Sequence, residues 1–328
     1  MSTLDISIVI PCLNEVGTIG KTLSALVCEL NNADLQYEII VVDNGSTDGS
    51  DLVAKDHGVD FIQTDAYPVA AVRNLGVKKS QGAVLVFLDA DIVVQDGWGQ
   101  HLGHVYKRLM EDDNLITGSH PQVPDDIRPA LYCWYKSLSE DTRDTHMGTG
   151  HMIVSRATFE KVGRFDESLV TNEDFYFCIE AKKIGVAVVS NPDMKVFHLG
   201  YPNNYSDFLK REIWHGLGDC NTIGRLLRSR VVWFGVAFIV FGLLAITSLF
   251  FSPTLFSISV FAFLLLPAGF NIIKFGYGGL REFTYRSLVA CVYLFSRGLA
   301  IPIYILNTNK RLHRGHKQAQ SGQSGEKV

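Results

Sequence analysis

Hydrophobic residues follow two different patterns along this chain of 328 residues. Up to residue 225, short apolar runs alternate with stretches in which apolar residues recur every three or four positions. The short runs are typical of buried strands in a parallel sheet, and the three-to-four spacing is typical of helices. From Val231 to Leu306 the chain is mostly apolar. The pattern therefore predicts a soluble α/β domain followed by a membrane segment.

Strands and helices are predicted to alternate through the soluble part. Such alternation, with connections of this length, predicts an α/β fold with a mostly parallel sheet flanked by helices. The predicted strands are 6–10, 37–42, 59–63, 83–88, 151–155, 186–189 and 195–197. The predicted helices are 17–30, a helix from the turn after Val42 towards Lys55, 69–79, 156–162 and 174–184.

One wholly apolar run ends in two carboxylates, Asp89 and Asp91, separated only by Ala90. In an extended chain these two side chains point the same way, because successive side chains alternate. Ligands of open α/β sheets bind at the carboxyl ends of the strands. Paired carboxylates there suit a hard divalent cation that also takes substrate phosphates. A solvated acidic turn is the alternative, and the rest of the chain decides between the two.

Other chemical groups fall at the same predicted sheet edge. The segment from Pro11 to Glu15 follows the first strand, and Asp43 follows the second. An acid such as Asp43 can accept hydrogen bonds from a ribose or a base, which favours a nucleotide. Neither G-x-G-x-x-G nor a P-loop follows the first strand, so NAD and P-loop sites are disfavoured. Arg73, on the helix before the acidic strand, is placed either to reach a phosphate or to hold an aspartate in place.

The second half of the soluble part adds two more candidates. Glu173 and Asp174 open a predicted helix, and capping by the helix dipole alone would explain acids at that position. A carboxylate fixed there beside a ligand cleft is also well placed to act as a general base. His198 follows a short strand and could add a nitrogen ligand to a metal, although a lone histidine is more often a packed side chain.

An ordered set of motifs resembles a known family, the family 2 inverting glycosyltransferases with a GT-A (nucleotide-diphospho-sugar transferase) fold. The motifs are SIVIPCLNE, VVDNGSTDGS, VRNLGV, VLVFLDADI, GTGHMIV, GRFDE and NEDFYF. The resemblance covers about residues 5–220. The chain lacks the Q-x-x-R-W motif of processive synthases, so transfer of a single sugar is favoured over polymerisation.

The resemblance also implies roles for individual residues. It implies a nucleotide-diphosphate sugar as donor and Mg²⁺ or Mn²⁺ as cofactor. The donor would be bound by Pro11, Glu15, Asp43, Arg73 and Asp89. The metal would be held by Asp91, the direct ligand, together with Asp89 and His198. Catalysis would fall to Asp174 as base with Glu173 assisting, beside an acceptor-side loop of Gly148, Thr149 and Gly150.

Two apolar stretches, 231–251 and 254–273, are each long enough to span a membrane. Only Ser252 and Pro253 separate them, which predicts a tight hairpin. Positive residues flank both stretches, and this places both ends in the cytosol. A third stretch, 287–306, contains Arg297 near its middle. A central arginine is unfavourable in lipid, so an interfacial or re-entrant position is favoured over a third span.

These patterns predict three regions. They are a cytosolic GT-A domain over 1–225, a membrane domain over 226–309 and a basic, polar, disordered tail over 310–328. No signal-peptide pattern is present, and the six cysteines show no C-x-x-C pairing. We expect a multi-pass protein of the cell (inner or plasma) membrane with its catalytic domain in the cytosol and no nucleic-acid partner.

A membrane-anchored sugar-transfer domain implies an acceptor at the membrane. The expected acceptor is a polyprenyl- or lipid-linked glycan in surface polysaccharide or glycolipid synthesis. Two alternatives stay open: a polyprenyl-phosphate sugar synthase, and a catalytically inactive membrane-bound subunit that binds nucleotide sugars. The cationic residues between the soluble and apolar parts could meet a lipid diphosphate or only lipid headgroups; they are Arg211, His215, Arg225 and Arg228.

Overall fold

The computed structural model describes residues 4–140, 146–220 and 222–322, with side chains described as far as residue 306. The chain divides into two compact units, Met1–Pro202 and Asn203–Val328. Each unit has its own core, and the first carries all the residues that the sequence proposes for catalysis and donor binding.

The first unit is built on a mostly parallel sheet, as the sequence predicts. Its strands, in spatial order within the described residues, are β3 (Asp60–Gln63), β2 (Tyr37–Asp43), β1 (Ile6–Cys12), β4 (Val84–Leu88), β7 (His151–Ser155), β6 (Leu115–Gly118) and β8 (Ala187–Val188). Strand β7 runs antiparallel to β4 and β6, and the other described pairs are parallel. A separate antiparallel ribbon pairs β5 (Ile92–Val94) with β9 (Val196–His198).

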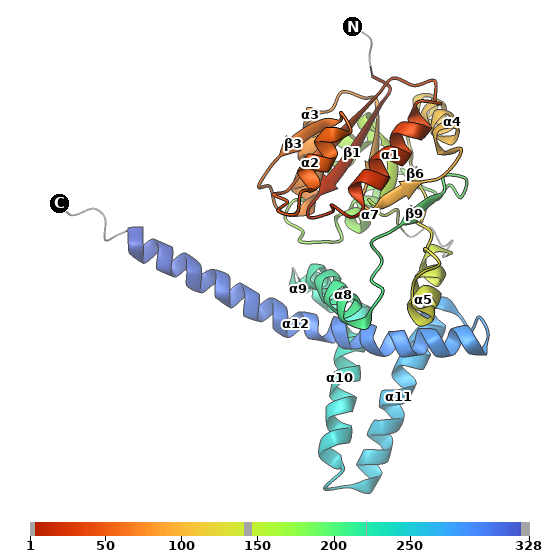
Figure 1. Cartoon of the computed structure of the whole chain (residues 1–328). Helices are drawn as coiled ribbons and strands as arrows, with labels where there is room; N and C mark the ends of the chain where they lie inside the picture. Colours follow the sequence, from red (N-terminus) through yellow and green to blue (C-terminus); the bar gives the residue numbers. More distant parts are fainter. Residues whose placement is uncertain (1–3, 141–145, 221, 323–328) are drawn as a thin grey trace, which may run out of the picture. The chain divides into compact units, whose positions relative to one another are not determined.

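Helices cover both faces of the sheet (Figure 1). Alternate side chains of β1 enter opposite layers, with Ile8 in one hydrophobic cluster and Val9 in the other. The layer of Ile8 is closed by α1 (Ile19–Leu30), α2 (Ser50–Asp56) and α4 (Trp98–Glu111). The layer of Val9 is closed by α3 (Val69–Lys79), α6 (Arg156–Val162) and α7 (Glu173–Lys183). The unit also contains α5 (Pro129–Ser139).

Helix α3 lies unusually close to the sheet at Gly76. A Cβ atom at this position would lie 2.4 Å from Cγ1 of Val9, so only glycine fits. Arg73 is three residues earlier, which places it on the same face of the helix. The close approach therefore brings the arginine to the sheet edge where the strands end.

Most predicted elements are present, and their ends move by a few residues. The sequence analysis missed β5, β6, α4 and α5. Helix α4 does carry a usable signal, because its buried residues Trp98, Leu102, Val105 and Leu109 follow helical spacing. The three residues of β5 pair with β9, a distant part of the chain, so no local pattern reports this strand.

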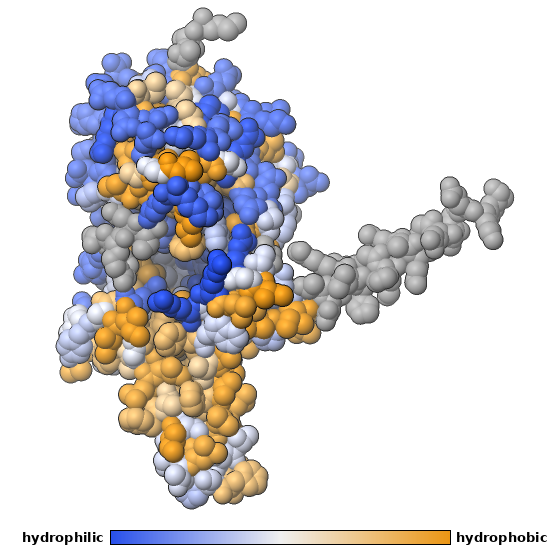
Figure 2. All heavy atoms as spheres, turned by 180° about the vertical axis from the view of Figure 1, so that it is seen from behind, coloured by the Kyte–Doolittle hydropathy of each residue, from blue (hydrophilic) through white to orange (hydrophobic). Residues whose placement is uncertain are grey.

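The second unit is helical. It contains α8 (Tyr205–Asp219), α9 (Ile223–Arg228), α10 (Arg230–Ser248), α11 (Pro253–Phe275) and α12 (Leu280–Gly322). Helices α10 and α11 form the predicted hairpin, and α12 runs across it rather than beside it (Figure 1). Figure 2 shows that the hairpin surface is largely hydrophobic. Three described helices are long and apolar enough to cross a membrane: Arg230–Ser248, Pro253–Phe275 and Leu280–Leu306.

Helix α12 is held to α8 and α10 by two kinds of contact. Gly235 and Gly298 allow the backbones of α10 and α12 to meet, since a Cβ on Gly235 would lie 2.5 Å from the Gly298 nitrogen. Arg297, the residue that made a third span unfavourable, is paired instead of exposed. Its guanidinium lies 2.9 Å from Glu212 and 3.7 Å from Asp219, both on α8.

Two predicted boundaries differ from the structure. The division between the units falls after Pro202 and not at residue 225, because α8 packs against α12 and so belongs to the helical unit. The tail predicted to be disordered from residue 310 is helical as far as Gly322, where the chain continues α12 through residue types that favour helix. Residues 323–328 of that tail lie outside the described residues.

Candidate active site

The carboxyl ends of β1, β2 and β4 meet at one edge of the sheet. Cys12 at the end of β1 lies opposite Asp43 at the end of β2, and β4 pairs with β1 on its other side. Because these strands are parallel, the loops that follow them emerge together. Pro11 lies within this edge, opposite Val42.

The loops after β1 and β2 are joined by side chains that bind backbone groups. Asn14 adopts φ = 58°, a left-handed conformation that asparagine tolerates better than most residues. Its Oδ1 accepts a hydrogen bond from the Thr47 nitrogen at 2.9 Å, and its own nitrogen donates to Ser46 Oγ at 2.9 Å. The Glu15 nitrogen donates to Ser50 Oγ at 2.7 Å. The two loops thus form one wall of the site. Asn14 was not among the predicted site residues.

Asp43 is fully buried at the base of this wall. Its Oδ2 accepts hydrogen bonds from the nitrogens of Gly45 and Ser46, both at 3.1 Å. Its Oδ1 is buried and has no hydrogen-bond partner among the described residues. A buried acceptor without a partner is unfavourable unless a ligand supplies a donor. Asp43 therefore offers one oxygen to a ligand in the loop wall.

Asp91 and His198 meet because β5 pairs with β9. Ile92 lies opposite His198 in that ribbon, and His198 Nε2 lies 3.0 Å from Asp91 Oδ2. Gly200 also lies against this carboxylate, because a Cβ at that position would lie 1.8 Å from Asp91 Oδ2. The pair presents one oxygen and one nitrogen ligand, both mostly shielded from solvent. Gly200 was not among the predicted site residues, although it lies two positions after His198.

Arg73 links Asp89, after strand β4, to Glu173, at the start of helix α7. Its side chain is 5% exposed, and its two terminal nitrogens each lie 2.6 Å from a carboxylate oxygen, one of Asp89 and one of Glu173. The sequence left two roles open for this arginine, a phosphate contact or the positioning of an aspartate. The structure places it against the carboxylates of Asp89 and Glu173, so one guanidinium bridges the two acids.

Asp174 is next to Glu173 and is enclosed by the glycine loop before β7. Its Oδ2 accepts a hydrogen bond from the Thr149 nitrogen at 3.3 Å, and a Cβ on Gly148 would lie 3.6 Å from that oxygen. Burial raises the pKa of the Asp174 carboxyl above its ordinary value, while the Phe175 amide and Arg73 act against that shift. A carboxyl with a raised pKa is a better proton acceptor when ionised.

The glycine loop also contacts the first aspartate. A Cβ on Gly150 would lie 3.3 Å from Asp89 Oδ2, and Thr149 Oγ1 lies 3.4 Å from Glu173 Oε1. The predicted loop of Gly148, Thr149 and Gly150 therefore lies against all three carboxylates. Small residues are needed here because the loop passes so near these side chains.

Glu15 faces the same edge from the loop after β1. Burial raises the pKa of its carboxyl, the nearby charges of Asp91 and Asp89 add to that shift, and the hydrogen bond from Thr18 acts against it. The Thr18 hydroxyl donates to Glu15 Oε2 at 2.8 Å. Glu15 thus lies close enough to Asp89 and Asp91 for their charges to act on it.

His151 follows the glycine loop and is fully buried. Its two ring nitrogens contact Trp98 and Ser119. Trp98 donates its indole N–H to His151 Nε2 at 3.0 Å, and Nδ1 lies 2.9 Å from Ser119 Oγ. The Ser119 backbone N–H also points at Nδ1, at 3.1 Å, so an N–H donor faces each of the two ring nitrogens. Burial lowers the pKa of His151 to about 3, so the ring is neutral.

The predicted metal ligands are only partly assembled. Among the described residues, no three His, Cys, Asp or Glu side chains converge on a point where a metal ion would fit. Asp91 and His198 do converge, whereas Asp89 turns towards Arg73. The pair would give a divalent cation one carboxylate oxygen and one imidazole nitrogen, and would leave its other positions to water and substrate phosphates.

The sequence is similar to known glycosyltransferases. The sequence model described as Glycosyl transferase family 2 matches residues 7–163, and that described as Glycosyl transferase family group 2 matches residues 108–274. Glycosyltransferase AglE of Haloferax volcanii is 25% identical over 251 residues, which are 71% of this chain and 81% of AglE. An uncharacterized glycosyltransferase of Rickettsia bellii is 31% identical over 115 residues, 34% of this chain but only 16% of that protein.

The fold also matches a solved structure. The mannosyltransferase PcManGT from Pyrobaculum calidifontis, in complex with GDP-Man and Mn²⁺, superposes with a TM-score of 0.54. The match covers 91% of this chain and 87% of that one, at 15% sequence identity. At this identity the similarity shows the fold, and the predicted GT-A architecture is confirmed.

Proposed function

Because this chain belongs to glycosyl transferase family 2, we propose that it moves a single sugar from a nucleotide-diphosphate sugar to a membrane-associated acceptor, with inversion. The observation that carries the proposal is the arrangement at the sheet edge. Arg73 connects Asp89 to Glu173, so the acidic strand end and the second acidic motif form one site. Asp174 lies beside them with one oxygen on the glycine loop.

The donor nucleoside would lie in the wall formed by the loops after β1 and β2. Asp43 Oδ1 is the buried acceptor that lacks a partner there, and a base or ribose donor would satisfy it. Pro11 and Glu15 flank the same wall. A ribose O–H or base N–H bound to Asp43 at the end of β2 would direct the diphosphate across β1 towards Asp91, which follows β4.

Asp91 and His198 would hold the divalent cation, Mg²⁺ or Mn²⁺, with Asp89 oriented by Arg73. The superposed mannosyltransferase binds Mn²⁺ in its own structure, which supports this choice. When bound, the cation supplies positive charge to the departing nucleoside diphosphate. Both terminal nitrogens of Arg73 lie against carboxylates, which supports a role in positioning these acids.

Asp174 would take the proton from the acceptor hydroxyl. The hydroxyl oxygen forms a bond to the anomeric carbon while the bond from that carbon to the diphosphate oxygen breaks on the opposite side. One displacement inverts the configuration and needs one base and one stabiliser of the leaving group. Glu173 would hold Arg73, and the loop of Gly148, Thr149 and Gly150 would shape the acceptor side.

The acceptor is proposed to be a polyprenyl- or lipid-linked glycan in surface polysaccharide or glycolipid synthesis. Three helices able to cross a membrane by length and composition support a membrane location. We place the α10–α11 hairpin in the bilayer of the cell membrane with both ends in the cytosol, and α12 at the interface. The pairing of Arg297 with Glu212 supports an α12 that stays at the surface, where its partner helix is polar.

The test is a nucleotide-sugar screen with the full-length protein in membranes, reading the lipid product by mass spectrometry. We expect one donor to be consumed, EDTA to stop transfer and Mn²⁺ or Mg²⁺ to restore it. The Asp91→Asn variant should lose activity even with excess metal. Transfer that continues in EDTA would overturn the metal site, and retention of the anomeric configuration would overturn the single displacement.

A second activity is favoured by one feature, the exposed Arg228 and Arg230 before and at the start of α10. These cations suit a lipid phosphate, which could itself be the acceptor in a polyprenyl-phosphate sugar synthase. A phosphate acceptor is already ionised and needs little help from a base. Near-normal transfer by Asp174→Asn would favour this activity, whereas a loss of about 10²–10⁴-fold would favour a hydroxyl acceptor.

A further inference from the structure

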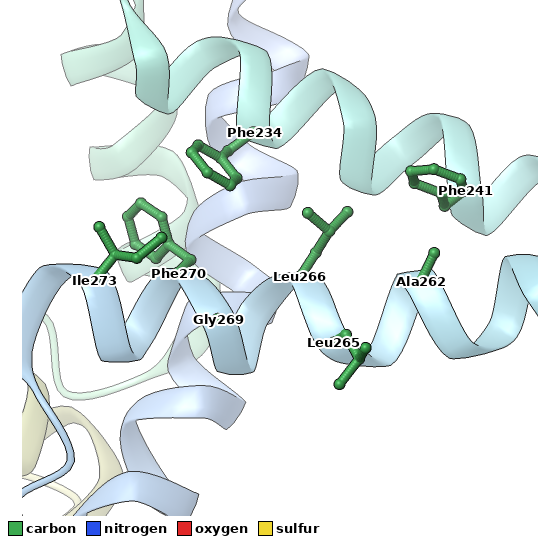
Figure 3. A pocket seen from close by; sticks show the side chains of 8 residues that line it. All are labelled: Phe234, Phe241, Ala262, Leu265, Leu266, Gly269, Phe270 and Ile273. Carbon is green, nitrogen blue, oxygen red and sulfur yellow. The ribbon is translucent and has the colours of Figure 1, made fainter.

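A narrow apolar groove runs along one side of the α10–α11 hairpin (Figure 3). Its volume is about 250 Å³. On α11 its walls extend from Ala262 to Ile273, about 16 Å along the helix at 1.5 Å per residue. This is about half the thickness of a bilayer's hydrocarbon core. The lining residues are Phe234, Phe241, Ala262, Leu265, Leu266, Gly269, Phe270 and Ile273.

Gly269 forms the floor of the groove. A Cβ at this position would meet no atom within 4 Å, so a larger side chain there would project into open space. The α11 residues Leu266 and Phe270 lie on either side of it, and the Phe270 ring meets the Phe234 ring of α10 with centroids 5.8 Å apart. The groove therefore has rigid aromatic walls at the end where α10 begins and α11 ends.

Both walls carry a cation one helical turn beyond this aromatic end. Arg230 is four residues before Phe234 on α10, and Lys274 is four residues after Phe270 on α11. Residues four apart lie on the same face of a helix, so both cations are on the side of the groove. Arg230 is exposed, and Lys274 lies over the Phe275 ring at 5.3 Å. An apolar channel with two positive charges at one end matches a long hydrocarbon chain that carries a phosphate.

We propose that this groove holds the hydrocarbon chain of the lipid-phosphate-linked acceptor, with its phosphate at Arg230 and Lys274. The inference rests on the proposed transfer to a lipid-linked acceptor and assigns that acceptor its place on the helical unit. Lipid tails are as apolar as the groove, so the chain gains little hydrophobic free energy by leaving the bilayer. The contacts between the phosphate and the two cations select this lipid over other lipids. The groove fixes the direction in which the hydrocarbon chain extends from the phosphate.

The test uses the full-length protein in nanodiscs and a polyprenyl phosphate that carries a diazirine on its chain. Phosphatidylcholine with the same diazirine serves as the comparison lipid. After illumination, mass spectrometry maps the crosslinks. We expect the polyprenyl probe to label Ala262–Ile273 at least five-fold more than the comparison lipid. Gly269→Leu should abolish that excess, because its Cβ meets no atom within 4 Å and the rest of the side chain extends into the groove.

Leu264→Phe is the matched control, since Leu264 is 64% exposed and does not line the groove. It adds bulk to the same helix and should leave labelling unchanged. Arg230→Gln should reduce labelling by the polyprenyl probe several-fold and leave that by phosphatidylcholine unaltered. Equal labelling by both probes, or unaltered labelling of Gly269→Leu, would overturn the proposal. So would loss of self-association in Gly269→Leu, which would identify a second copy of the chain as the occupant.

The crosslinking experiment needs no donor sugar, so its outcome does not depend on whether the protein transfers sugar to a lipid acceptor. If the wild-type protein is labelled in the groove but transfers no sugar, the groove assignment is supported and the proposed transfer to a lipid acceptor is wrong. If sugar is transferred equally by wild type and Gly269→Leu, with no groove labelling, the proposed function stands and the groove assignment is wrong.

Discussion

Arg73 and Glu173 are 100 residues apart in the sequence, yet their side chains form a buried ion pair of 2.6 Å. The same guanidinium binds Asp89 at 2.6 Å. The arginine thus fixes the relative position of two acidic motifs that arise from different elements. An arginine does this better than a lysine because its planar fork offers two separate donors in fixed directions.

Replacing Arg73 should damage both stability and activity. Arg73→Met leaves the buried carboxylate of Glu173 without its ion-pair partner, and we expect it to lower the free energy of unfolding by about 3–5 kcal/mol. Thermal unfolding with transfer assays measures both effects. The control is Lys55→Met, which breaks an exposed ion pair with Asp51 and should change stability by less than about 1 kcal/mol.

The double variant Arg73→Met with Glu173→Gln separates the two roles. Removing both charges should recover much of the lost stability, because Glu173 no longer leaves a buried charge without its ion-pair partner. Transfer activity should stay low, since Asp89 is no longer oriented. Recovery of activity together with stability would show that Arg73 serves the fold alone.

Gly200 should be essential for metal use. In Gly200→Ala the new Cβ would lie 1.8 Å from Asp91 Oδ2, so the carboxylate must move away from His198. We expect the Mn²⁺ concentration for half-maximal activity to rise about ten-fold or more, with stability little changed. Gly17→Ala is the matched control, because its Cβ would meet no atom within 4 Å. Equal metal dependence in the two variants would count against Asp91 as a ligand.

The stability of the first unit should fall in acid because of His151. Its pKa is about 3 in the folded protein, against 6.5 for an ordinary histidine. The unfolded state therefore binds more protons, so this contribution is fully present above pH 6.5 and is lost as the pH falls towards 3. His151→Gln keeps hydrogen-bonding capacity but cannot titrate. Its melting temperature should be lower at neutral pH and should fall less steeply from pH 6.5 to 4; parallel slopes would exclude His151 as the source.

The ion pair between Arg297 and Glu212 should show strong coupling. Glu212→Gln and Arg297→Met should each lower the melting temperature in detergent, because each leaves a shielded charge without its main partner. The double variant should be more stable than the sum of the two losses predicts, with a coupling of about 0.5–3 kcal/mol. Additive losses would mean that the pair does not hold α8 to α12.

The sequence predicts the sheet well because its central strands carry an unambiguous pattern. Every residue of β4 is buried, and the same residues form a continuous apolar run. Helices α3 and α6 and strand β7 likewise begin and end where their patterns predict. These elements are specified by nearby residues, so local reasoning finds them.

The orientation of the acidic side chains was harder to predict. Asp89 and Asp91 were expected to point the same way, as in a strand, yet one contacts Arg73 and the other His198. The strand ends at Leu88, and the Ile92 nitrogen donates to the Asp89 carbonyl in a turn, so alternation no longer applies. The partners come from residues far along the chain, which no local pattern specifies.

The contact between Glu212 and Arg297 has a consequence for biosynthesis. Glu212 is synthesised before both helices of the hairpin, and Arg297 after them, so the pair encloses the whole of α10 and α11. It cannot form until the hairpin is complete. Until Arg297 has been synthesised, Glu212 and Asp219 of α8 lack this cationic partner, so the contact between α8 and α12 is completed only after the whole anchor has been made.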